Sequence, residues 1–314
     1  MKKALPYREL PHLDPVNDGR HQLRDLPLER ESVPYTFLAP DEGLAAFCYT
    51  WVNKDHVAGS AFVVFGPGVG EPIAERVDGI KVSPDMNFDD WKVGSVHLKH
   101  DLQFQKSEMH LKGEGASIHA HFEAFHPPYA YGFHPDGCPD YAATNRIEQA
   151  GKVKGHFRIG DREIPFESFG ARDHSWGTRD WHTPQHWKWV HVQAGPDLCV
   201  HFWEFQARSI TELRGYVLRD GKMAEIDGVD VDFTRDEQWN QRDLHFKAHD
   251  TLGRTTEVKG RHYAHYPLIP DPKTVLNEGA MTCDIEGRAG MGWSEFMWPA
   301  EYLQHLRATA AGHR

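Results

Sequence analysis

Residues 151–181 read GKVKGHFRIGDREIPFESFGARDHSWGTRDW. In the first two thirds of this stretch apolar and polar side chains alternate, which is the pattern of a β-strand with one buried face. Gly160 and Asp161 separate two such runs, and this predicts a β-hairpin. The last part, residues 171–181, holds two Arg-Asp pairs, a histidine and two tryptophans. That mixture predicts either a buried polar junction or a reactive site.

Short strand-like runs continue on both sides of this stretch. Residues 95–105 and 107–125 alternate with period two, and residues 186–195 and 197–207 are rich in β-branched and aromatic side chains. Helical patterns are scarce, and residues 299–310, which begin with a proline and continue with good helix formers, are the best predicted helix. Many short antiparallel strands indicate an all-β protein of sandwich or barrel type.

Composition narrows the classes of function. The chain has 314 residues and a formal net charge of −11, which disfavours binding to nucleic acids or anionic membranes. The apolar runs are too short to span a bilayer, and we expect no secretory signal because the first 15 residues lack an apolar core. Four scattered cysteines without a C-x-x-C motif are typical of reduced thiols in a cytoplasmic protein. A homodimer is compatible with all of this.

The end of the quoted stretch resembles a signature of the carotenoid 1,2-hydratase and AttH-like superfamily, G-x-R-D-H-S-W-G-x-R. The residues that carry the resemblance are Gly170, Arg172, Asp173, His174, Ser175, Trp176, Gly177 and Arg179. It implies two lipocalin-like β-barrel or sandwich domains followed by a short C-terminal helix. We expect the first domain in residues 1–168, with an extended N-terminal arm, and the second in residues 169–314, beginning at the motif.

The resemblance also implies a site. In the hydratases of the superfamily the His and Trp of the motif are linked to activity, and His174 and Trp176 match them. The Tyr and Asp expected on the following strand are missing here, and Glu204 is the carboxyl group that stands nearest to their place. We therefore expect His174, Asp173 and Glu204 as catalytic acids or bases. The residues expected to line the substrate site are Trp176, Trp181, Trp187, Trp189, His201 and Trp203.

The remaining charged residues of the motif have a structural interpretation. Arg172, Arg179 and Asp180 are expected to brace the fold through buried ion pairs, as Arg–carboxylate pairs commonly do. On a strand, Trp187 and Trp189 would share one face, as would His201 and Trp203, while Glu204 would point the other way.

Histidine is frequent, with 22 residues, so metal binding has to be considered. His119 and His121 would share a strand face with Glu123, whereas His262 and His265, three residues apart, would face opposite sides. Neither spacing is an established metal signature, and the expectation is ordinary strand histidines with no metal and no cofactor.

The leading hypothesis is a cofactor-free hydratase or dehydratase, a hydro-lyase that uses acid–base chemistry on a hydrophobic isoprenoid, steroid or polyketide-like molecule. One alternative is a carrier or sensor that binds such a ligand without converting it. Another is an isomerase or cyclase, whose product would have the mass of its substrate. The family fold is a firmer inference than any of these activities.

Overall fold

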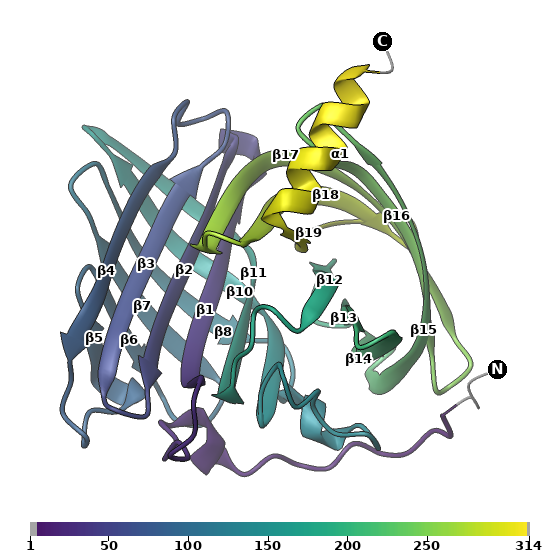
Figure 1. The fold of residues 1–314 in the computed structure, drawn as a ribbon, viewed down its shortest axis with the longest axis horizontal. Helices are drawn as coiled ribbons and strands as arrows, with labels where there is room; N and C mark the ends of the chain where they lie inside the picture. Colours follow the sequence, from purple (N-terminus) through teal and green to yellow (C-terminus); the bar gives the residue numbers. More distant parts are fainter. Residues whose placement is uncertain (1–4, 313–314) are drawn as a thin grey trace. The chain divides into compact units, whose positions relative to one another are not determined.

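The computed structural model describes residues 5–312, which divide into two compact units. One unit is Pro11–Arg179, and the other contains the described residues up to Leu10 and those from Asp180 onward. Each unit is built on one antiparallel β-sheet with its own apolar core (Figure 1). The predicted all-β fold of two barrel-like domains is confirmed.

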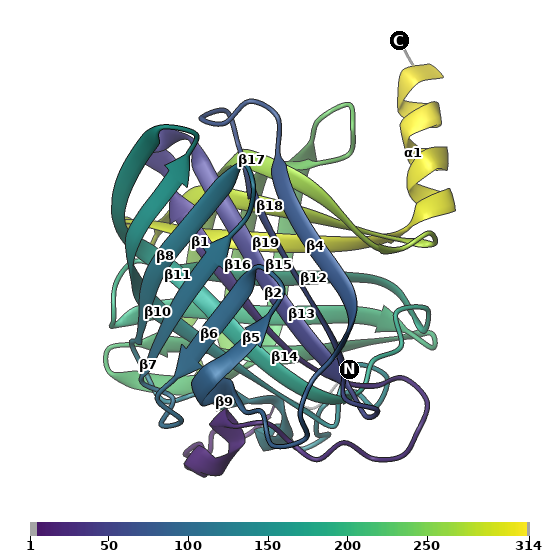
Figure 2. The ribbon, with the colours of Figure 1, turned by 90° about the vertical axis from the view of Figure 1, so that its left-hand side faces the viewer.

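The first unit, the sheet unit, has its strands in the order β4-β3-β2-β1-β11-β10-β8-β7-β6-β5, with β9 paired to β10 (Figure 2). The strands are β1 (Glu29–Ala39), β2 (Leu44–Asn53), β3 (Val57–Phe65), β4 (Ile73–Lys81), β5 (Trp91–Val93), β6 (Val96–His100), β7 (Lys106–Lys112), β8 (Ala116–Ala124), β9 (Tyr129–Ala130), β10 (Asn145–Ile159) and β11 (Arg162–Thr178). Four short 3-10 helices accompany them: η1 (Pro15–Asp18), η2 (Pro40–Glu42), η3 (Phe88–Asp90) and η4 (Tyr131–Phe133).

This long sheet curls, so that strands far apart in its order meet. The Ser60 hydroxyl of β3 donates to the carbonyl of Val93 on β5 at 2.6 Å, and the Trp91 indole donates to Thr50 on β2 at 2.8 Å. One face of the curled sheet therefore encloses the apolar core, and the other faces outward. Strand β8 shows the expected alternation, because Ile118 and Ala120 are buried while His119 and His121 are not.

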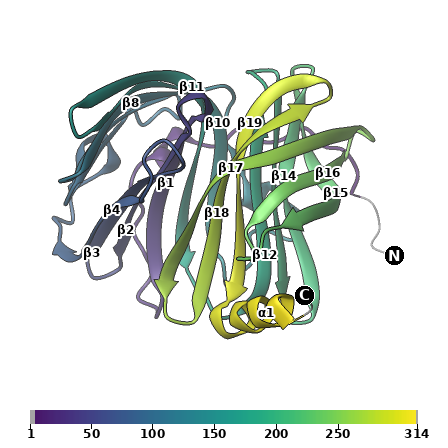
Figure 3. The same ribbon diagram turned by 90° about the horizontal axis from the view of Figure 1, so that it is seen from above.

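The second unit, the barrel unit, is a closed barrel in which β12 pairs with β19. Its strands are β12 (Pro184–Gln193), β13 (Leu198–Ala207), β14 (Ile210–Arg219), β15 (Lys222–Arg235), β16 (Gln241–Asp250), β17 (Thr255–Asp271), β18 (Thr274–Ile285) and β19 (Arg288–Pro299). Helix α1 (Ala300–Gly312) follows the last strand (Figure 3). Its Leu303 packs into the barrel core.

Local predictions are largely confirmed. The helix begins at Ala300, one residue after the predicted start, and Gly160–Asp161 forms the predicted hairpin between β10 and β11. The predicted N-terminal arm ends where β1 begins, at Glu29.

Two expectations differ from the structure. The division between the units lies after Arg179 rather than after residue 168, because the motif continues β11, which pairs with β1 and β10. His262 and His265 do not face opposite sides: a register shift between His262 and Ala264 brings their rings to 5.3 Å, in a stacked arrangement. A β-bulge of this kind breaks the period-two rule.

No helix within residues 5–312 is both long and apolar enough to cross a membrane. All four cysteines, Cys48, Cys138, Cys199 and Cys283, are free thiols, as expected.

Buried histidines make the stability of the protein depend on pH. Burial lowers the pKa of His126 to about 4. Burial and the nearby Lys188 charge lower the pKa of His186 to about 4. Burial and the neighbouring His265 lower the pKa of His262 to about 3. Between pH 6.5 and 4 these imidazoles bind protons only in the unfolded chain. Stability is therefore complete above pH 6.5 and is lost as the pH falls through that value.

We predict that the free energy of unfolding decreases by about 2 kcal/mol for each of these three imidazoles between pH 7 and pH 5. Urea denaturation at both pH values measures the decrease. His126→Asn should remove the part of the decrease that this imidazole contributes. The control His245→Asn, on the solvent-exposed side of β16, should leave the decrease unchanged. An unfolding free energy that is equal at the two pH values contradicts the prediction.

Candidate active site

The motif occupies the end of β11, in the middle of the sheet unit, and the strand alternation divides it between two faces. Arg172, His174 and Trp176 point to the inner face, where Arg172 lies opposite Tyr35 of β1 in the strand register. Asp173 and Ser175 point to the outer face. Arg172, Asp173, His174 and Ser175 are all buried. A single strand therefore supplies polar groups to both sides of the sheet.

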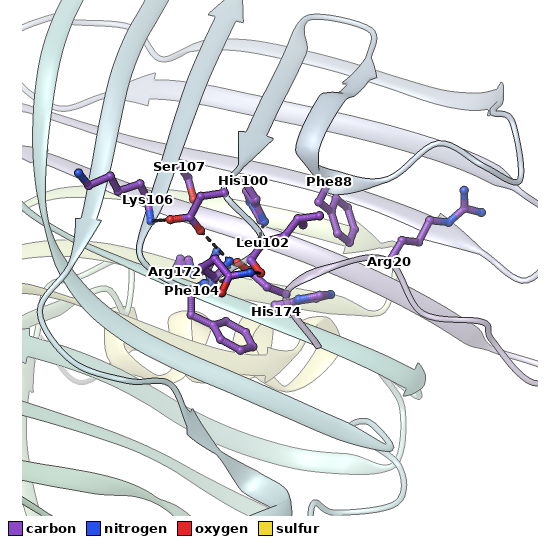
Figure 4. Close-up of polar contacts among 12 residues, drawn as sticks. Arg20, Phe88, His100, Leu102, Phe104, Lys106, Ser107, Arg172 and His174 are labelled. Atoms are coloured by element: carbon purple, nitrogen blue, oxygen red, sulfur yellow. Dashed lines mark hydrogen bonds and ion pairs between the residues drawn. The ribbon is translucent and has the colours of Figure 1, made fainter. Parts of the chain in front are cut away.

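On the inner face Arg172, which lies near His100 and Phe104 (Figure 4), forms a buried ion pair with Asp18, the last residue of η1, at 2.7 Å. Its guanidinium also donates to Gln149 at 2.9 Å and to the Tyr35 hydroxyl at 3.4 Å. Asp18 in turn accepts the backbone N–H of Phe104 at 2.7 Å. The result is a polar cluster that joins η1, β1, β10, β11 and the loop before β7.

His100 completes this cluster. Its Nε2 is 2.8 Å from the Tyr35 hydroxyl, and its Nδ1 is 3.5 Å from Asp18. Burial raises the pKa of Asp18, but Arg172 and then His100 outweigh it and hold that pKa well below its ordinary value. Burial lowers the pKa of His100, so the ring is neutral near pH 7. The cluster therefore contains one ion pair and a neutral imidazole.

A second inner-face group is centred on Glu31 of β1. Its Oε1 is 2.7 Å from Nε2 of His174 and 2.7 Å from Nδ1 of His21, and its two oxygens accept the backbone N–H of His21. The His21 ring stacks on Trp176 with centroids 3.6 Å apart. Glu31 and His174 are fully buried.

The electrostatics of this group favour a charged carboxylate and a neutral imidazole. Burial raises the pKa of Glu31, but hydrogen bonds from His174 and His21 outweigh it, and the net pKa is lowered. Burial lowers the pKa of His174, and the neighbouring Glu31 opposes this only in part. At neutral pH the imidazole therefore carries its one proton on Nε2 and donates it to Glu31.

This tautomer leaves Nδ1 of His174 as an unprotonated acceptor. That nitrogen is buried and has no hydrogen-bond partner among the described residues. The ring is surrounded by aromatic side chains, with Phe88 edge-on at 5.2 Å and Trp176 at 5.2 Å between centroids. A carboxylate that fixes the tautomer of a histidine whose other nitrogen is free is the arrangement of a general base.

The residues that cover this group belong to the N-terminal arm of the same unit. Arg20 donates to the backbone carbonyls of Ser83 and Met86, at 2.9 and 3.0 Å, and its own N–H donates to Asn87 at 2.6 Å. The arm between η1 and β1 is thus tied to the loop before η3. The His174 side chain has no solvent-exposed surface in this arrangement.

The outer face of the motif has a different environment. Asp173 forms an ion pair with Arg146 of β10, whose Nε also donates to Glu148 at 2.6 Å. Arg179 donates to the Ser175 hydroxyl at 2.7 Å. Asp173 is therefore separated from His174 by the thickness of the sheet, so the structure does not bring these two expected catalytic residues together.

The other expected site residues belong to the barrel unit. Four of these aromatic residues, Trp187, Trp189, His201 and Trp203, are buried on the outer face of the barrel, where Trp189 lies opposite Trp203 in the register. Trp181 is half-buried and precedes β12, with its ring 5.8 Å from that of Trp187. Glu204 points to the inner face and binds Lys188 at 2.6 Å, as the alternation predicts. Asp180 accepts His182 N–H at 2.8 Å and the Thr183 hydroxyl at 2.7 Å, which caps a turn. The aromatic residues of the barrel unit that were expected at the site are Trp181, Trp187, Trp189, His201 and Trp203.

Sequence reasoning missed the partners of the motif. These partners are far from the motif in the sequence: Asp18 and His21 lie in the N-terminal arm, Glu31 in β1 and His100 in β6. No local spacing links them to the motif. One signal was present: Glu29 and Glu31 are acidic residues at the start of a strand that is mostly apolar from Val33 onward. A buried charge in such a strand requires a partner.

Two groups in the sheet unit have the composition of a metal site. One ligand atom from each of His21, Glu31 and His174 lies within 4.8 Å of the others, and the same holds for Glu108, His119 and His121. In the first group Glu31 contacts both imidazoles, while Nδ1 of His174 has no hydrogen-bond partner among the described residues. The second lies on the outward face of β7 and β8.

Comparison with known proteins gives a family and a fold. A family model described as a domain of unknown function (DUF7064) matches residues 14–300. An AttH protein from Nitrosomonas europaea shares the fold with a TM-score of 0.63 at 14% identity, over 93% of this chain and 98% of that one. Kievitone hydratase from Nectria haematococca gives 0.62 at 10% identity, over 95% and 98%.

A third similar structure is CghA, with a TM-score of 0.61 at 11% identity over 86% of this chain and 88% of that one. CghA has also been solved with Sch210972. No curated protein sequence matches the chain. The fold that the predicted resemblance implied is confirmed by these shared folds.

We predict that Arg172→Met destabilises the protein by about 3–5 kcal/mol, because it leaves the Asp18 carboxylate buried without its partner. Asp18→Asn should also destabilise the protein. The double variant should lose less free energy of unfolding than the sum of the two single losses. Urea denaturation of the three variants measures the effects. Strictly additive losses would show that the two side chains do not stabilise the fold as a pair.

Proposed function

We propose that this chain, which belongs to the DUF7064 family, is a cofactor-free enzyme of the hydratase and cyclase type that acts on a hydrophobic small molecule. The observation that carries the proposal is the free Nδ1 of His174, in a ring oriented by the Glu31 carboxylate and surrounded by aromatic side chains. The hydratase named among the proteins with the same fold supports it.

In the proposed reaction His174 exchanges one proton at Nδ1. For water addition to an activated double bond, Nδ1 takes a proton from the attacking water as its oxygen bonds to carbon. The proton is then returned to the neighbouring carbon. Glu31 stabilises the transient imidazolium through the Nε2–H bond, so no net charge is left in the site. Dehydration is the same sequence reversed.

The aromatic surroundings favour an apolar substrate. Phe88 and Trp176 lie against the imidazole, and such rings bind isoprenoid, steroid or polyketide-like carbon skeletons through apolar contact. The substrate reaches His174 when the arm segment around Arg20 moves. We also propose a cytoplasmic location, which the four free cysteines support.

A cyclase or isomerase is the second candidate, and it is supported by the fold shared with CghA, a protein that has been solved with Sch210972. The two candidates differ in product mass. Incubation with a panel of terpenoids, steroids and enones, followed by mass spectrometry, shows a gain or loss of water for a hydratase and no change for a cyclase. Binding without any conversion would instead identify a carrier.

We predict that His174→Ala lowers kcat/KM by about 10²–10⁴-fold, the usual contribution of a general acid–base group. Glu31→Gln should lower it as well, because the carboxylate charge that stabilises the imidazolium is removed. The control is His110→Ala, an imidazole of the same unit on the outward face, which should retain activity. Melting temperatures confirm folding. Full activity in folded His174→Ala would exclude the proposed base.

The pH dependence follows from the lowered pKa of His174, whose burial favours the neutral ring. A base must be unprotonated, so kcat/KM should be constant above about pH 6.5 and decrease only at lower pH. The pH–rate profile of the wild-type protein measures this. A decrease that begins above pH 7 would contradict the assignment.

A further inference from the structure

The outward face of the sheet unit carries a row of four histidines across four neighbouring strands. In the strand register His97 lies opposite His110, His110 opposite His119, and His119 opposite His156. The successive ring centroids are 5.8, 4.1 and 5.5 Å apart. Such a row places imidazoles at the spacing of adjacent strands, perpendicular to the chain direction.

A second row runs parallel to the first, two residues along each strand. It contains Lys99, Glu108, His121 and Lys154, each opposite the next in the register. Residues two apart share a face, so the rows lie side by side. At their centre Glu108 and His110 on β7 and His119 and His121 on β8 form the corners of a quadrilateral.

Contacts within this quadrilateral are short. Oε1 of Glu108 is 2.8 Å from Nε2 of His110 and 3.0 Å from Nε2 of His119. One ligand atom each of Glu108, His119 and His121 lies within 4.8 Å of the others. Zinc with bonds of about 2.0–2.2 Å needs donors about 3.3 Å apart, which small rotations of partly exposed side chains provide. The Glu108 and His119 side chains are 30% and 35% exposed.

We infer that Glu108, His119 and His121 form a zinc-binding site on the outward face of β7 and β8, with His110 holding the Glu108 carboxylate in place. Two imidazoles and a carboxylate are a ligand set that zinc accepts, and water takes the fourth position. His119 binds through Nε2 after its proton moves to Nδ1. The His110–Glu108 hydrogen bond is the kind of supporting contact that orients a metal-bound carboxylate.

The surrounding charges define which histidines take part. His97 is engaged by Asp90 at 2.6 Å, and His156 is 3.9 Å from Glu163. The Lys99 ammonium is 3.7 Å from Glu108 and competes with a cation for that carboxylate. Lys154, opposite His121, lies 3.7 Å from Glu167, which partly neutralises it.

The zinc site shares no residue with the site at His174. A result that disproves zinc binding would therefore leave the proposed enzymatic function unchanged. It also revises the expected partner of His119 and His121. Glu108 from the neighbouring strand takes the place that the sequence suggested for Glu123. Glu123 instead lies opposite Lys106 and Lys152 in the register.

The test is titration calorimetry of the full-length chain with zinc chloride at pH 7.5, after the protein has been treated with a chelator and dialysed. We predict one high-affinity zinc ion per chain. His119→Ala and His121→Ala should abolish that step, and His110→Ala should weaken it by about 10–100-fold. Lys99→Met should strengthen it. Zinc should raise the melting temperature of the wild-type protein but not of folded His121→Ala.

Two controls identify the site. His245→Ala, which removes an exposed histidine paired with Glu257 on the barrel unit, should bind zinc as the wild-type protein does. His174→Ala should also bind normally. The inference is overturned if the wild-type protein binds no zinc, if His119→Ala and His121→Ala retain full affinity, or if binding is lost in His174→Ala instead.

Discussion

The ion pair between Arg172 and Asp18 is the interaction on which the candidate site depends. Both groups are buried, and together they hold η1 against the inner face of the sheet. From there the arm continues to His21, whose backbone and ring bind Glu31. Without the ion pair η1 would lose its link to Arg172, and two unpaired charges would be left in a low-dielectric interior.

The crowded composition of the motif follows from its place in a central strand that is buried on both faces. Period-two alternation sends Arg172, His174 and Trp176 to the inner face and Asp173 and Ser175 to the outer one, so each face receives its own polar set. On the inner face, Arg172 stabilises the fold through its ion pair, and His174 is the proposed proton-exchanging group. The outer set pairs Asp173 with Arg146. One eleven-residue stretch thus serves two separate environments.

Sequence patterns predicted the strands, the hairpin at Gly160–Asp161 and the final helix, because each depends on local periodicity and turn chemistry. They did not predict the partners Glu31 and Asp18, which reach the motif only through strand pairing and the path of the arm. The bulge that brings His262 to His265 was also missed, since one extra residue reverses the expected faces. Glu108, beside His119, depends on strand register in the same way.

The central claim is that His174 is a neutral imidazole with its proton on Nε2 and a free Nδ1. It is tested most directly by nitrogen-15 NMR of the imidazole side chains in the wild-type protein at pH 7, with His174→Ala used to assign the signal. We predict one pyrrole-like nitrogen, Nε2, hydrogen-bonded to Glu31, and one pyridine-like nitrogen, Nδ1. A proton on Nδ1, or a doubly protonated ring, would contradict it.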